Sequence, residues 1–160
     1  MFNYRIYKGN YKDNLIVDID KTLIYGGMCE IKGRVWDAIP SSIISSILSW
    51  MEQKFRWYNI NYKTLSTILN YGLQGKKITI LTAREEIQST IDLIHDIIPD
   101  WQELDLSIVQ LGSYNPKVDK ARYIYNNIKG SWVLIDDNIS TLVYTYYNVP
   151  NGEVLHPEEL

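Results

Sequence analysis

Short apolar runs, rich in β-branched residues, alternate along this chain with longer amphipathic stretches, and few architectures accommodate that alternation. The runs cover residues 14–19, 77–82, 106–110 and 132–135, and a shorter one at 153–155 suits an edge strand. Continuous apolar runs of this length are typical of strands that are buried on both faces. Strands that alternate with helices form parallel sheets covered on both sides. We therefore expect an α/β fold of three layers, with a mostly parallel, Rossmann-like sheet between helices.

The amphipathic stretches predict five helices, at residues 41–57, 62–73, 85–98, 116–128 and 138–147. Ser41 or Ser42 suits the start of the first helix, and Asp137 or Asn138 suits the N-cap of the last. Pro99 closes the third helix. The first helix has an apolar side, formed by Ile43, Ile44, Ile47, Leu48 and Met51. In parallel sheets ligands bind beyond the carboxyl ends of the strands, so functional residues are expected there.

The length and composition suit a single domain over residues 1–160. The chain is 46% hydrophobic and 22% charged, as is ordinary for a globular protein. Its apolar runs are far shorter than a membrane span, and the first ten residues lack the apolar segment of a secretory signal. The single cysteine, Cys29, excludes an internal disulfide and a cysteine-based zinc site. We therefore expect a cytoplasmic protein that makes no contact with a membrane.

The net charge of −3 argues against stable binding of long nucleic acids, because such proteins usually carry a basic excess that neutralises phosphates. A local basic patch is still compatible with the sequence, formed by Lys76, Lys77, Arg84, Lys117, Lys120 and Arg122. The sequence gives no indication of the oligomeric state.

Acidic residues follow the first and the fourth of the main apolar runs. Asp18 and Asp20 end the first run, and residues two apart on a strand share a face. Two neighbouring carboxylates repel each other unless a cation lies beside them, and a hard dication such as Mg²⁺ suits oxygen ligands. Asp136 and Asp137 end the fourth run and give a second acidic pair. The alternative interpretations are a solvated turn at Asp18 and a helix cap at Asp137.

Residues suited to binding an anion follow the second run and precede the fourth. Thr82, Ala83 and Arg84 lie where a strand gives way to a helix, and the N–H groups of a helix start bind anions. Arg84 could add a bidentate phosphate contact. Lys117 and Lys120 lie in the helix before the fourth run. The alternatives are an ordinary threonine N-cap and solvated basic side chains.

This order of residues resembles the haloacid dehalogenase (HAD) superfamily. The DIDKT sequence at residues 18–22 is similar to the first motif of that superfamily, DxDxT. Thr82 resembles the second motif, Lys120 the third, and Asp136 with Asp137 the fourth. The resemblance covers residues 14–147. A hairpin over residues 29–36, turning at Lys32 and Gly33, resembles the flap of the family, and residues 25–60 as a whole would hold this flap and a small helical cap insert.

The resemblance implies a magnesium-dependent phosphohydrolase. Asp18 would be the nucleophile that forms an aspartyl-phosphate, and Asp20 would act as the acid and base. The ion would be held by Asp18, the backbone carbonyl of Asp20, and Asp136, with Asp137 alongside. The phosphoryl oxygens would be bound by Thr82, Ala83, Arg84 and Lys120. The acid at Asp20 favours a phosphatase or phosphomutase over a dehalogenase, whose leaving group needs no proton.

Two assignments stay open at the level of sequence. Lys117 fits the third motif of some family members, although the VDK context favours Lys120. The substrate is also open, because members select substrates through their caps. Residues 20 to 82 leave room for only a small cap, whose aromatic residues would either stack on a nucleobase or pack the insert.

The LTAR and LIDDN segments look similar to those of deoxynucleotide 5′-phosphatases and phage-type polynucleotide 3′-phosphatases. We therefore expect a small phosphorylated substrate, a nucleotide or a nucleic-acid end. The alternatives are a phosphoprotein phosphatase and a catalytically silent binding module of the same fold.

Overall fold

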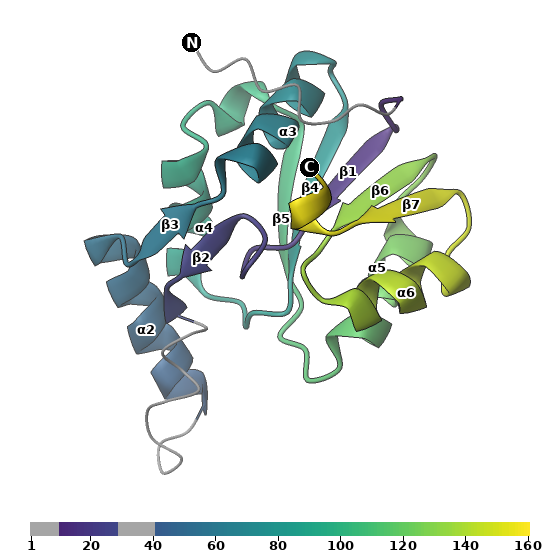
Figure 1. Cartoon of the computed structure of the whole chain (residues 1–160). Helices are drawn as coiled ribbons and strands as arrows, with labels where there is room; N and C mark the ends of the chain where they lie inside the picture. Colours follow the sequence, from purple (N-terminus) through teal and green to yellow (C-terminus); the bar gives the residue numbers. More distant parts are fainter. Residues whose placement is uncertain (1–9, 29–40) are drawn as a thin grey trace.

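The computed structural model describes residues 10–28 and 41–160, with side chains described from residue 43 onward in the second range. Its centre is a five-stranded sheet in the order β5-β4-β1-β6-β7 (Figure 1). All four strand pairs are parallel. The strands are β1 (Asn14–Val17), β4 (Lys77–Thr82), β5 (Leu106–Gln110), β6 (Trp132–Ile135) and β7 (Gly152–Leu155). The predicted parallel α/β sheet and its edge strand are confirmed.

Strand β1 lies between β4 and β6, so residues after these three strands come together at one end of the sheet. Val17 at the end of β1 is in register with Ile80 of β4 and Ile135 of β6. All four residues of β1 and of β6 are buried, which explains why all of them except Asn14 are apolar. The central position of β1 places the acidic residues that follow it in the middle of the carboxyl edge.

Each face of the sheet has a hydrophobic core covered by helices. On one face, Leu15 and Val17 pack with residues of α3 (Tyr62–Leu73) and α4 (Gln88–Ile97). On the other face, Ile16 packs with residues of α5 (Pro116–Asn127) and α6 (Ile139–Asn148). Successive strand residues point to opposite faces, so the apolar run of β1 serves both cores. The described residues also form two single-turn 3₁₀ helices, η1 (Trp101–Glu103) and η2 (Pro157–Glu159).

The helix predicted at residue 85 begins three residues later, at Gln88. The backbone before it is engaged by a neighbouring loop: Gly112 N–H donates to the Arg84 carbonyl and Ser113 N–H to the Ala83 carbonyl. Ile87 N–H donates to the side chain of Gln110. Because these groups are paired outside the helix, residues 83–87 form a loop that carries Arg84. The N-cap of α6 is Asn138, whose side chain accepts from Thr141 N–H, so of the two predicted caps Asn138 is the one used.

A second, two-stranded antiparallel sheet joins β2 (Ile24–Gly26) and β3 (Tyr58–Ile60) beside the main sheet (Figure 1). Helix α2 (Ser41–Phe55) lies between these strands in sequence and packs against α4. The insert after the first strand therefore contains a helix, as predicted, but its two strands are far apart in sequence. The hairpin predicted at residues 29–36 lies outside the described residues.

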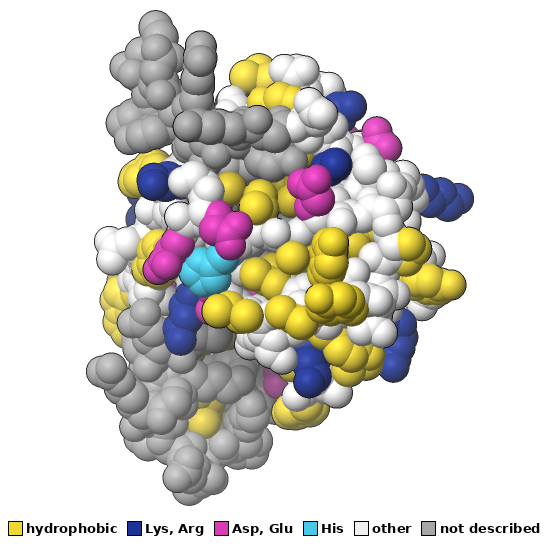
Figure 2. All heavy atoms as spheres, turned by 45° about the vertical axis from the view of Figure 1, so that its right-hand side comes forward, with side chains coloured by type: hydrophobic (Ala, Val, Ile, Leu, Met, Phe, Trp, Pro, Cys, Tyr) yellow, Lys and Arg dark blue, Asp and Glu magenta, His cyan; other side chains and the backbone are white. Residues whose placement is uncertain are grey.

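The outer edge of the sheet, at β7, carries an apolar groove next to α6. Hydrophobic side chains gather on this face of the molecule, with a histidine and acidic groups at their border (Figure 2). The groove is lined by Ile139, Leu142, Val143, Val154, His156, Glu158 and Glu159.

Among the described residues, no helix is both long enough and apolar enough to cross a bilayer.

Candidate active site

The carboxyl ends of β1 and β6 bring two acidic residues side by side. Asp18 directly follows β1, and its N–H donates to the carbonyl of Ile135 at the end of β6. Asp136 directly follows Ile135, and its N–H donates to the carbonyl of Leu155 in β7. Both carboxylates are nearly inaccessible, with Asp18 7% and Asp136 1% exposed. Asp18 and Asp136 therefore meet at the sheet edge although 117 residues separate them in the chain.

One buried ammonium group joins these two carboxylates. Lys120 Nζ lies 2.9 Å from Asp18 Oδ1 and 2.6 Å from Asp136 Oδ2. Its side chain points inward from α5, and Lys120 is 3% exposed. Lys117, three residues earlier, is exposed and lies with Nζ 5.9 Å from the ring centre of Tyr144. Of the two lysines considered for the third motif, Lys120 is the one at the acidic cluster.

The turn after Asp18 folds a hydroxyl group back onto the cluster. Lys21 has a positive φ of 58°, which reverses the chain so that the N–H groups of Thr22 and Leu23 reach the Ile19 carbonyl. Thr22 Oγ1, which is fully buried, lies 3.4 Å from both Asp18 Oδ2 and Asp137 Oδ1. It also accepts a hydrogen bond from Asp137 N–H at 3.1 Å. The threonine of the DIDKT motif thus links the ends of β1 and β6.

Three carboxylates form a group that suits a hard dication. Asp18, Asp136 and Asp137 each offer an oxygen, and these oxygens lie within 4.8 Å of one another. Asp136 Oδ1 accepts from Asn138 N–H, and Oδ2 faces Lys120. An all-oxygen donor set of this kind matches Mg²⁺ better than a softer metal. The residues fit the predicted ion, and the chemistry that a dication supplies there is neutralisation of the clustered negative charge. Asp20, predicted to contribute its backbone carbonyl, is not in this group of side chains.

The cluster carries more negative than positive charge. Burial raises the pKa of Asp18 to about 6 despite the opposing effect of Lys120. Burial also raises the pKa of Asp136 and of Asp137. The pKa of Lys120 would fall on burial, but Asp18 and Asp136 outweigh this and raise it. Burial is the largest cause of the shift for each carboxylate, and the single ammonium of Lys120, which binds Asp18 and Asp136, offsets it only in part.

This imbalance predicts a pH-dependent stability in the absence of divalent ions. Because the pKa of Asp18 is about 6 in the folded chain and near 3.8 in the unfolded chain, the folded state holds the proton more tightly. The contribution to stability is therefore present below pH 3.8 and is lost as the pH rises through 6, by about 3 kcal/mol. In EDTA, the stability of Asp18→Asn relative to wild type should rise by this amount between pH 4 and pH 7.5. Urea unfolding at each pH measures the difference, and a difference that does not change with pH would contradict the assignment.

The residues predicted to bind phosphate are held in a network on the β4 side of the cluster. Thr82 Oγ1 accepts from Arg84 N–H at 3.1 Å, and the Ala83 carbonyl accepts from Ser113 N–H. The guanidinium of Arg84 binds Asp20, with Nε 2.9 Å from Oδ2 and Nη2 2.6 Å from Oδ1. Asp18 and Asp20 thus have different partners: the first faces Lys120 and the second faces Arg84.

One residue of this network was not predicted from the sequence. Glu52 of α2 is fully buried and accepts from Arg84 Nη1 at 2.7 Å. The expected apolar side of this helix is only partly correct, because Ile43 and Ile47 are each 51% exposed whereas Ser45, Ser49 and Glu52 are buried. Those three polar residues follow the i, i+4, i+7 spacing of one helix face, but a polar face is typical of the solvated side of a helix, so the spacing alone does not indicate burial.

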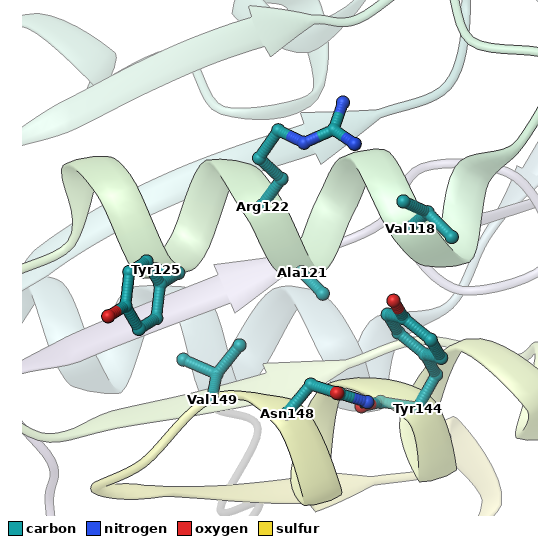
Figure 3. A pocket seen from close by; sticks show the side chains of 7 residues that line it. All are labelled: Val118, Ala121, Arg122, Tyr125, Tyr144, Asn148 and Val149. Carbon is teal, nitrogen blue, oxygen red and sulfur yellow. The ribbon is translucent and has the colours of Figure 1, made fainter.

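A separate pocket lies between α5 and α6, away from the acidic cluster. Figure 3 shows its lining, with Ala121 of α5 on the side toward Tyr144 and Asn148 of α6, and with the Arg122 side chain pointing away from α6. None of the candidate active-site residues lines it, although the lining residue Ala121 directly follows Lys120 in the sequence. The pocket is open and mostly apolar, and nothing in its lining indicates a chemical role.

Solved structures of other proteins share this fold. The chain is similar to a chain in the solved structure of the Pnkp1/Rnl/Hen1 RNA repair complex, with a TM-score of 0.56, 17% identity and 89% of this chain covered. The chain spans only 42% of that one. It is also similar to a HAD-superfamily hydrolase from Ehrlichia chaffeensis, with a TM-score of 0.51, 16% identity, and coverage of 91% of this chain and 86% of that chain. The fold is HAD-like. No protein-family model matches the sequence, and no curated protein matches it.

Proposed function

We propose that this HAD-like chain is a magnesium-dependent phosphomonoester hydrolase in which Asp18 is the nucleophile. One observation carries the proposal: Asp18 and Asp136, from the ends of β1 and β6, bind the same Lys120 ammonium, with Asp137 in the same group. Buried acids that face one cation at the carboxyl edge of a parallel sheet suit charge neutralisation in phosphoryl transfer. Asp136 and Asp137, together with Asp18 and the carbonyl of Asp20, would hold the ion.

Two oxygens of Asp18 have different surroundings, which suits a nucleophile. Oδ1 faces Lys120 at 2.9 Å, whereas Oδ2 lies 3.4 Å from the hydroxyl of Thr22. In the first step a carboxylate oxygen of Asp18 bonds to phosphorus while the bond from phosphorus to the ester oxygen breaks. Asp20, which Arg84 holds as a carboxylate in the free chain, takes up a proton from solvent and gives it to the departing oxygen. In the second step Asp20 takes a proton from water, the water oxygen bonds to phosphorus, and the bond to Asp18 breaks to release inorganic phosphate.

The basic groups would stabilise the phosphoryl oxygens during both steps. Lys120 lies at the nucleophile and carries its full charge at neutral pH, because the two carboxylates raise its pKa. Thr82 and Ala83 lie at the end of β4, next to the end of β1. Arg84 is the less direct candidate, because its guanidinium is bound to carboxylates. A phosphoryl group would have to replace one of those partners to contact it.

The substrate class we favour is a nucleotide or a nucleic-acid end. The LTAR and LIDDN segments resemble those of nucleotide and polynucleotide phosphatases, and one protein of similar fold belongs to an RNA repair complex. Exposed aromatic rings on and after α2 offer stacking surfaces, with Trp50, Phe55 and Trp57 each at least 40% exposed. The net charge of −3 favours a small phosphorylated molecule over a long nucleic acid. A cytoplasmic location is proposed on the basis of the single cysteine.

Two other functions are alternatives to a nucleotide or nucleic-acid phosphatase. A phosphoprotein phosphatase would use the same acids with an open site, and a binding module would keep the fold without turnover. Both are tested by measuring phosphate release from deoxynucleoside monophosphates, 3′-phosphorylated oligonucleotides and phosphopeptides, with Mg²⁺ and with EDTA. We expect turnover of the first or second class that EDTA abolishes. Preference for the phosphopeptide would favour the protein phosphatase, and no turnover of any substrate would favour the binding module.

A further inference from the structure

A buried ion-pair network joins the insert helix to the proposed acid and base. Arg84 binds Asp20 on one side and Glu52 on the other, and the Arg84 and Glu52 side chains are 2% and 0% exposed. We propose that Glu52 is a positioning residue that fixes the guanidinium of Arg84 and, through it, the carboxylate of Asp20. This inference rests on the proposed function, because it concerns the residue that would protonate the leaving group.

All the hydrogen-bond donors of Arg84 are engaged by protein groups. Its Nε and Nη2 donate to the two oxygens of Asp20. Its Nη1 and Nη2 donate to the two oxygens of Glu52, at 2.7 and 2.9 Å, and Nη1 also lies 3.4 Å from the hydroxyl of Thr90. A guanidinium has five N–H groups in one plane, so carboxylates on two of its edges fix both its position and its tilt. The position of the Asp20 carboxylate therefore depends on Glu52, which binds the other edge of the guanidinium.

Glu52 is itself firmly held. Its Oε2 accepts from the backbone N–H of Met28, just after β2, at 2.7 Å. The helix that carries it is bound to α4 through Ser49, whose hydroxyl lies 2.6 Å from that of Ser89, and through Gln53, whose amide donates to Asp96. Gly27 packs directly against Glu52, since a Cβ on this glycine would overlap Oε2. The carboxylate thus connects the small sheet, the insert helix and the loop after β4.

The energetics argue that this network serves more than stability. Moving charges into a protein interior costs about as much as their attraction returns, so apolar residues of the same volume are often equally stabilising. This network lies among the proposed active-site residues. Arg84 comes two residues after Thr82, and its guanidinium binds Asp20. A guanidinium placed to within a fraction of an ångström can orient an acid for proton transfer, where small displacements reduce the rate. Glu52 binds the edge of the Arg84 guanidinium opposite to Asp20, so its effect on Asp20 would act through Arg84.

The dependence of the hydrolysis rate on the leaving group distinguishes a role of Glu52 in positioning Asp20 from a role in folding. An aryl phosphate such as p-nitrophenyl phosphate releases a stable phenolate and needs little help from an acid, whereas an alkyl phosphate needs its leaving oxygen protonated. Glu52→Gln keeps the shape of the side chain but loses its charge. We expect kcat for the alkyl phosphate to fall by roughly tenfold or more, and kcat for the aryl phosphate to fall by less than about threefold. The matched control is Lys54→Gln on the same helix, which also removes one charge but from an exposed side chain, and it should leave the ratio of the two rates unchanged.

Glu52→Asp provides a second variant in case the neutral side chain prevents folding. It keeps a carboxylate in the network but withdraws it from Arg84, so the same selective loss is expected. Equal losses on both substrates, or no loss on either, in a wild-type background that hydrolyses them would overturn the role of Glu52 and leave the proposed function intact. A wild-type protein that hydrolyses neither substrate would refute the proposed function and the positioning role together.

Discussion

Replacing Asp18 by asparagine should abolish phosphate release, with kcat falling by roughly 10⁴-fold or more. The amide has nearly the shape of the carboxylate but cannot attack phosphorus, so the covalent step is lost. The loss should be the same for aryl and alkyl phosphates, because both would need this nucleophile. Steady-state hydrolysis of p-nitrophenyl phosphate in Mg²⁺ measures the effect.

The matched control is Asp13→Asn, at the opposite end of the same strand. Asp13 precedes β1, and its carboxylate accepts hydrogen bonds from Ser131, far from the acidic cluster. This variant should retain wild-type turnover. Urea unfolding of Asp18→Asn at pH 7.5 shows whether the variant is folded under the assay conditions, so that a loss of activity reports the missing nucleophile. Substantial turnover by a folded Asp18→Asn protein would remove Asp18 as the nucleophile.

Replacing Lys120 by methionine should have the largest effect on stability. The ammonium group is the partner of both Asp18 and Asp136, and its removal leaves buried carboxylates without their cation. Removing one partner from a buried ion pair costs about 3–5 kcal/mol. We expect the free energy of unfolding in EDTA at pH 7.5 to fall by this amount. Adding Mg²⁺ should restore part of it, because a dication that binds the folded state alone stabilises that state.

Lys117→Met is the control for this prediction. Lys117 is on the same helix, three residues before Lys120, and its ammonium lies over the ring of Tyr144 at the surface. An exposed cation–π contact is worth about 0.5–1 kcal/mol, so this variant should lose no more than that. Urea unfolding of both variants, with and without Mg²⁺, gives the comparison. Equal stabilities of the two variants would show that Lys120 does not neutralise the cluster.

The strands could be predicted from sequence because burial on both faces leaves a strong signal. The bounds of β4, β5 and β6 match the apolar runs, and the Asp18 and Asp136 that follow two such runs meet as expected. The parallel arrangement explains this success. When strands run in one direction, whatever follows each of them lies at the same edge, whatever the separation in sequence.

The environment of Asp20 and Arg84 could not be predicted in the same way. The sequence places Arg84 near a helix start, where a solvated side chain and a phosphate ligand were equal alternatives, and the structure pairs it with Asp20 and Glu52. That pairing depends on how α2 packs against α4, which local sequence patterns do not determine. The exposed Ile43 and Ile47 show the same limit, because an apolar stripe does not say which side of a helix meets its neighbour.

The small sheet illustrates a further limit. Its strands β2 and β3 are only three residues long and are separated by the whole of α2. Hairpin signals in sequence rely on short turns between strands, and a pair separated by a helix gives none. Gly26 and Gly27, with φ of 73° and 77°, mark the point where the chain leaves β2, but two adjacent glycines alone do not name the partner strand.

A crystal structure of the protein with Mg²⁺ and beryllium trifluoride, a mimic of the phosphoryl group on an aspartate, tests the central claim most directly. The account predicts beryllium bonded to a carboxylate oxygen of Asp18, Lys120 beside the fluorides, and the ion bound by Asp18, Asp136 and Asp137. An ion and fluoride bound elsewhere, with Lys120 still joining Asp18 to Asp136 as it does here, would contradict it.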